Sequence, residues 1–84
     1  GKDMELIFPP APELRNLYRA ATIGDIEAVE IEVNRIKNLD NSYLAFVNKI
    51  LQMANEFEAE RIRKLLIKLC PNIENLNKVD KSDD

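Results

Sequence analysis

The chain has 84 residues, 45% of them hydrophobic and 32% charged, which fits one small globular domain and is too apolar for intrinsic disorder. Its net charge of −3 argues against a nucleic-acid-binding module, which usually carries a basic patch. The sequence contains no histidine, which excludes Ser-His-Asp and Cys-His nucleophiles, the usual zinc sites and phosphotransfer through an imidazole. No apolar run approaches the ~20 residues that cross a bilayer, so we expect no membrane insertion.

Residues 1–11 are expected to form an extended, proline-rich arm or linker. The prolines of FPPAP fix φ and push their neighbours toward extended geometry. The spacing Pro9-x-x-Pro12 also matches the loosest pattern for a polyproline ligand of an aromatic groove. A linker that enters a helix at Pro12, where the missing N–H does no harm, explains the same residues, and we favour it. The apolar residues before the prolines can pack back on the domain as a strap.

The first helix is predicted at 12–22, followed by a sharp corner. Its apolar face follows helical spacing and consists of Leu14, Leu17, Tyr18 and Ala21. Gly24 suits the left-handed conformation that ends a helix, and Asp25 can cap the next helix. A phosphate-binding loop needs several glycines and a Lys-Ser or Lys-Thr pair, which AATIGDIEAV lacks. Gly24-Asp25 therefore predicts a corner and no ligand site.

A second helix is predicted at 26–38 and a third at 43–54. The second helix has its glutamates early and its cations late, which suits the helix dipole and indicates a solvated face rather than an acid–base pair. Its predicted buried residues are Ile26, Val29, Val33 and Ile36. Apolar side chains cover about half the circumference of the third helix, so we expect it at the centre of the core.

The fourth helix is predicted at 57–69, after a capping box formed by Asn55 and Glu58. A proline then stops the helix. The four-helix domain accordingly covers 12–70, and we expect 71–84 to be a polar, frayed tail. Its apolar residues Ile73, Leu76 and Val79 leave open a weak extra turn. The final letters, DKSDD, resemble a fragment of a calcium loop but lack its glycine and its distal glutamate, so they predict no metal site.

A shift of 33 residues aligns the apolar positions of the first two helices with those of the last two, whereas the polar residues do not match. The pattern predicts two stacked αα-hairpins, although any two amphipathic helix pairs of similar length align in this way. The period is close to that of tetratricopeptide and ankyrin arrays, and AATIGDIEAV resembles the opening of an ankyrin repeat without the rest of that motif. We predict an all-α, compact four-helix domain built of two αα-hairpins.

No residue predicts catalysis, and we expect neither a cofactor nor a bound metal. Two aliphatic residues fall outside the core stripes, Ile31 on the second helix and Ile67 on the fourth. Arg61 and Lys64 share a flank of the fourth helix, which fits either an anionic partner or simple solvation. These four residues are the predicted contacts with a partner protein. Cys70 follows a helix C-terminus, where the dipole disfavours a thiolate, and it forms no internal disulfide.

Two long segments carry a resemblance to a known family. PPAPELRNLYRAATIGDIEAVEIEVNRI and DNSYLAFVNKILQMANEFEAERIRKLL resemble the helical segment that closes many bacterial, especially cyanobacterial, hybrid sensor histidine kinases after the receiver domain. The resemblance covers roughly residues 8–69 and rests on helix-core and cap positions. It implies a cytoplasmic accessory domain in two-component signalling. A histidine phosphotransfer domain is similar in size but needs an exposed histidine, which this sequence lacks.

We therefore expect a non-catalytic interaction or regulatory module of a hybrid sensor kinase. Its partner would be the receiver domain, the kinase core or a second copy, the last giving a homodimer. The alternative is a helical-repeat scaffold unrelated to signalling, which binds a peptide on a concave face lined by Tyr18 or Phe46.

Overall fold

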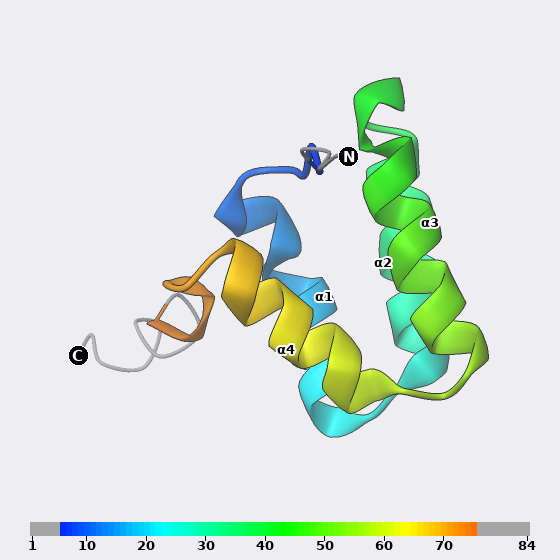
Figure 1. Cartoon of the computed structure of the whole chain (residues 1–84), viewed down its shortest axis with the longest axis vertical. Coiled ribbons are helices and arrows are strands. Elements are labelled where there is room, and N and C mark those ends of the chain that lie inside the picture. Colours follow the sequence, from blue (N-terminus) through cyan, green and yellow to red (C-terminus); the bar gives the residue numbers. More distant parts are fainter. Residues whose placement is uncertain (1–5, 76–84) are drawn as a thin grey trace.

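The computed structural model describes residues 6–75, which form four α-helices and no β-strand. The helices are α1 (Ala11–Ile23), α2 (Ile26–Lys37), α3 (Leu44–Asn55) and α4 (Ala59–Leu69), and a 3₁₀ turn, η1 (Asn41–Tyr43), leads into α3 (Figure 1). This architecture confirms the predicted all-α, four-helix fold. Pro12 is the second residue of α1 rather than the first. The N–H groups of the first turn of a helix have no intrahelical acceptor, so a proline is tolerated at either position.

The four helices close into a ring in which each helix contacts two others. α1 and α3 each contact both α2 and α4. The turn after α1 and the turn after α3 lie at the same end of the molecule (Figure 1). The contact of α1 with α2 corresponds to that of α3 with α4, and the contact of α1 with α4 corresponds to that of α3 with α2. This correspondence is the pattern of an approximate two-fold axis between the hairpins. The hairpins therefore close against each other, instead of stacking as successive layers of an open array.

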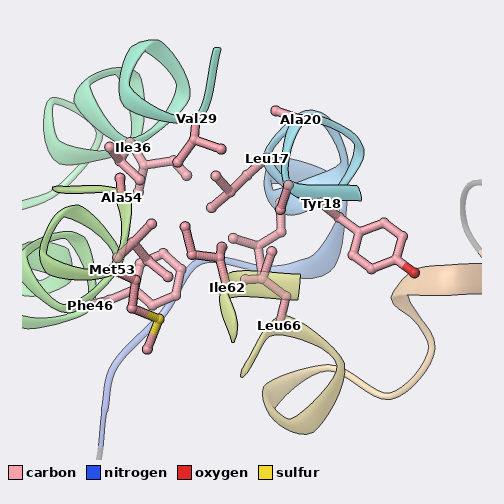
Figure 2. Close-up of a cluster of buried hydrophobic side chains, with 14 of the residues drawn as sticks. Leu17, Tyr18, Ala20, Val29, Ile36, Phe46, Met53, Ala54, Ile62 and Leu66 are labelled. Carbon is pink, nitrogen blue, oxygen red and sulfur yellow. The ribbon is translucent and has the colours of Figure 1, made fainter. Parts of the chain in front are cut away.

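Side chains from all four helices meet in one hydrophobic core (Figure 2). The largest fully buried side chains are Phe46, Leu14, Leu17, Ile36, Ile50, Ile62, Leu66 and Ile73. Burying one such side chain stabilises a fold by roughly 1.5–3 kcal/mol. α1 buries as many residues as α3, so the core has no single central helix. Ile26, predicted as buried, packs against the core only in part because it lies in the first turn of α2.

The corner after α1 is confirmed in detail. Gly24 has φ +77°, its N–H donates to the carbonyl of Ala21 at 3.1 Å, and the N–H of Asp25 donates to that of Ala20 at 2.9 Å. These two bonds are the Schellman pattern that satisfies the last carbonyls of a helix. The Asp25 carboxylate then accepts from the N–H of Ala28 at 3.1 Å and caps α2 as predicted.

The turn after α3 has the same hydrogen bonds without a glycine. The N–H groups of Phe57 and Glu58 donate to carbonyls three and five residues earlier, at 2.9 and 3.0 Å, and Phe57 has φ +56°. The predicted capping box is therefore wrong, because Asn55 is the last residue of α3. The turn uses residues 56–58, which delays the start of α4 to residue 59. The Glu58 carboxylate makes no cap and instead accepts from Arg61 at 2.6 Å.

The described part of the arm, residues 6–10, packs against the domain as a strap. The ring of Phe8 lies 6.5 Å from the ring of Phe46, and Pro9 is fully buried. The prolines of the Pro9-x-x-Pro12 spacing are thus divided between the packed strap and the helix α1. Neither proline belongs to an open polyproline segment.

The fold continues past residue 70, where we expected the domain to end. A short helical turn follows α4, and its first residue, Ile73, is fully buried. The hydroxyl of Tyr18 donates to Oε2 of Glu74 at 3.2 Å. Residues 71–75 are therefore part of the packed domain, while the rest of the predicted tail, 76–84, lies outside the described residues.

Residues that are 33 positions apart share their backbone conformation as well as their apolar character. α1 and α3 begin 33 residues apart, and so do α2 and α4. The left-handed residues Gly24 and Phe57 have the same separation. Most of the aligned core pairs are buried at both positions, except that Leu51 and Leu69 are only partly buried. The two hairpins are two versions of one structural unit.

Candidate functional site

A hollow of about 210 Å³ opens between α1 and α2 and is almost entirely apolar. We call it the α1–α2 groove, and its lining residues are Asn16, Arg19, Ala20, Ile23, Ala28, Ile31 and Glu32. Ala20 is buried and Ala28 is partly buried, whereas Ile23 and Ile31 are 70% and 62% exposed. The alanines form the inner wall of the groove and the two isoleucines reach into solvent.

The groove follows from a pattern shared by both helices. Ala20 and Ile23 are three residues apart on α1, and Ala28 and Ile31 have the same spacing on α2. Side chains at i and i+3 lie on one face of a helix, so each helix presents a small residue beside a large one. The two methyl side chains leave space between the helices, and the isoleucines border that space.

The charge at the groove is uneven. The Glu32 carboxylate accepts from Nε of Arg35 at 3.0 Å, and the same guanidinium donates to Oε1 of Glu13 at 2.9 Å. Hydrogen bonding to Glu13, and then to Glu32, raises the pKa of Arg35 above its ordinary value, so the cation persists beside both carboxylates. Arg19 makes no ion pair with any other residue in 6–75. Within the described residues, the groove therefore carries one carboxylate paired with a cation, Glu32, and one cation without an ion pair, Arg19.

Three of the four apolar groove residues have charged counterparts in the second hairpin, the exception being Ala20, whose counterpart is the buried Met53. At the 33-residue shift, Glu56 replaces Ile23, Arg61 replaces Ala28 and Lys64 replaces Ile31. All three are exposed. Charged residues are thus compatible with these three positions of the fold, so packing does not require apolar residues at 23, 28 and 31.

The four predicted contact residues do not form one site. Ile31 lines the α1–α2 groove and is exposed as predicted. Arg61 and Lys64 are exposed, but they lie on α4, which makes little or no contact with α2. Ile67 is partly buried and packs against the core, because α4 contacts both α1 and α3 and so turns more than one face inward.

Of the groove residues, sequence reasoning identified only Ile31, and it missed the other three apolar ones, Ala20, Ile23 and Ala28. The helix predicted at 12–22 stops before Ile23, and no role was predicted for either alanine. The signal was an Ala-x-x-Ile spacing on each side of the predicted corner. It becomes informative only when the two helices are known to pack side by side.

Within 6–75, no three His, Cys, Asp or Glu side chains cluster as metal ligands would. Cys70 is partly buried at the edge of the core. None of the helices in this range is long and apolar enough to cross a bilayer. The calcium-like DKSDD lies outside the described residues.

Comparison with known proteins gives no relative: no family model, no curated protein and no solved structure matches the chain.

Proposed function

We propose that this domain is a non-catalytic protein-interaction module and that the α1–α2 groove is its contact surface. The observation that carries the proposal is the pair of exposed isoleucines, Ile23 and Ile31, around a hollow of about 210 Å³, because the residues at the equivalent positions of the second hairpin are the charged Glu56 and Lys64. Apolar residues that packing does not require are typical of a surface that another protein covers. The groove itself fits an apolar side chain of the partner. Arg19, which has no ion pair within residues 6–75, favours an acidic group next to that side chain.

The biological setting that we propose is two-component signalling in the cytoplasm. It is supported by the resemblance of residues 8–69 to the C-terminal helical segment of hybrid sensor histidine kinases. In that setting the groove receives an apolar side chain of the adjacent receiver domain, and the kinase core is a second possible partner. The peptide-binding scaffold has less support, since Tyr18 is only 6% exposed and Phe46 is fully buried, so neither lines an open concave face.

The experiment is a titration of the isotope-labelled domain with the receiver domain, followed by amide chemical shifts, with and without a phosphoryl analogue. We expect the perturbed amides to cluster at the groove. Ile31→Glu should abolish binding, because a carboxylate would lose hydration in an apolar contact. The matched control is Lys64→Glu, which places the same residue at the equivalent point of the second hairpin and should leave binding intact.

Two results would contradict the proposal. The first is the absence of perturbation with the receiver domain at millimolar concentration. The second is perturbation confined to α4 around Arg61 and Lys64, which would place the contact on the second hairpin.

A further inference from the structure

Phe57 has an unusual backbone conformation for its residue type and an exposed aromatic ring. Its backbone is left-handed, with φ +56°, and its side chain is 78% exposed. L-amino acids other than glycine and asparagine seldom occupy this region, because Cβ approaches the following carbonyl. An exposed side chain gains little from packing that would offset this strain. No other residue in 6–75 except Gly24 has a positive φ.

The first hairpin shows what the turn alone requires. Gly24 occupies the position equivalent to Phe57 and makes the same Schellman hydrogen bonds at no steric cost. A phenylalanine at this point is therefore not explained by folding. Backbone strain that the fold does not require is concentrated at functional sites. The exposed phenyl ring of Phe57 is therefore a candidate for contact with another surface.

The α1–α2 groove fits the ring in size. Its volume is about 210 Å³, and a dry apolar cavity of ~150 Å³ is enough to hold benzene. Its walls carry the apolar side chains of Ile23 and Ile31. The Phe57 ring does not fill its own groove, since it projects from the turn between α3 and α4 into solvent.

The charges also match. Glu56 precedes Phe57, is exposed, and makes no ion pair with another residue in 6–75. Arg19, at the groove, is likewise without an ion pair in the described chain. A phenyl ring in the groove brings an adjacent carboxylate near this cation, and such pairing steers association and fixes orientation. The same acidic flank disfavours an anionic lipid surface.

We propose that the Phe57 ring of one copy inserts into the α1–α2 groove of a second copy, with Glu56 facing Arg19. This inference rests on the proposed role of the groove as a contact surface, and it names a second copy as an occupant. Ring and groove are different surfaces, so copies either pair reciprocally or continue head to tail. Every contact then needs Phe57 from one copy and Ile31 from the other.

The test is sedimentation of the full chain from micromolar to millimolar concentration. The contact is centred on one side chain, so we expect weak association that appears as a rise in average mass at the higher concentrations. Phe57→Gly removes the ring and Ile31→Glu spoils the groove. Each variant alone should lower the association constant at least about tenfold, as loss of a hot-spot residue does.

An equimolar mixture of the two variants gives the sharpest result. Phe57→Gly retains an intact groove and Ile31→Glu retains an intact ring, so one contact can form between them. We expect the mixture to associate where neither variant does alone. Phe57→Asn serves as a second ring deletion with a side chain that tolerates the left-handed conformation, and circular dichroism verifies that each variant is folded.

Three outcomes would overturn the inference: a wild-type chain that stays monomeric at millimolar concentration, association that survives both deletions of the ring, or a mixture that stays monomeric while the wild type associates. None of these decides the proposed function, because the receiver-domain titration reports on the groove independently. A monomeric chain whose groove still responds to the receiver domain would refute self-association alone.

Discussion

At the level of single residues, the two hairpins solve the same turn with different amino acids. Gly24 and Phe57 both end a helix in the left-handed conformation. A Cβ added at Gly24 would meet no heavy atom within 4 Å, so a substitution there changes the backbone energy and little else. The Phe57 side chain is largely exposed. Substitutions at Gly24 and Phe57 therefore measure the energetic cost of the left-handed backbone conformation at two equivalent turns of one molecule.

We predict opposite effects on stability for Gly24→Ala and Phe57→Gly. The first should lower the free energy of unfolding by about 1 kcal/mol, because alanine is strained at positive φ. The second should raise it by roughly 0.5–1 kcal/mol, because relief of strain exceeds the larger entropy of glycine in the unfolded chain. Urea unfolding measures both. A destabilised Phe57→Gly would mean that the ring makes stabilising contacts, contrary to its exposure.

At the level of secondary-structure elements, Arg35 ties the end of α2 to the start of α1. Its guanidinium donates to Oε1 and to the backbone carbonyl of Glu13, each at 2.9 Å, and to Glu32 on its own helix at 3.0 Å. Only a planar, multiply donating group can reach acceptors in these three directions. The bonds fix the open ends of the hairpin, opposite the corner at Gly24. They also hold Glu32 beside the groove.

Arg35→Ala should lower the free energy of unfolding by about 1 kcal/mol. We take a low value because the guanidinium is partly exposed, so solvent screens the ion pairs. Arg35→Lys should lose less, since it keeps the charge but reaches fewer acceptors. Urea unfolding of Arg35→Ala, Glu13→Ala and the double variant gives the coupling energy between the two residues. Additive effects would show that the pair does not join the helices.

At the level of the whole molecule, the segment after α4 completes the core. Ile73 is fully buried although only a proline and an asparagine separate it from Cys70 at the end of α4. The bond from Tyr18 to Glu74 joins this segment to α1. The helical ring is thus extended by a short turn that reaches back to the first helix, and the strap at residues 6–10 covers part of α3.

Ile73→Ala should therefore be costly. Truncating a fully buried isoleucine usually lowers the free energy of unfolding by about 2–5 kcal/mol, through lost burial and an unfilled cavity. Thermal and urea unfolding measure the loss. The control is Asn75→Ala, an exposed position in the same turn, which should change stability by less than about 0.5 kcal/mol. Equal, small effects at both positions would support the frayed tail that the sequence suggested.

Features that depend on a few neighbouring residues were predictable from the sequence alone. Helical periodicity located all four helices, and the conformational freedom of Gly24 with the acceptor of Asp25 defined the first corner. The placement of Ile31 on the outer side of its helix was also a local matter. Such features act within three to five residues, which is the range of helical hydrogen bonds and side-chain spacing.

The way in which the helix faces combine depends instead on how the helices pack together. The Ala-x-x-Ile pairs became a groove because α1 and α2 lie side by side, and Ile67 became partly buried because α4 packs on two helices. The left-handed conformation of Phe57 was not predicted, because no local rule favours phenylalanine at that position of a turn. Burial of Ile73 depends on where the chain runs after α4. Each of these outcomes is set by packing between segments distant in sequence, which periodicity along one helix does not record.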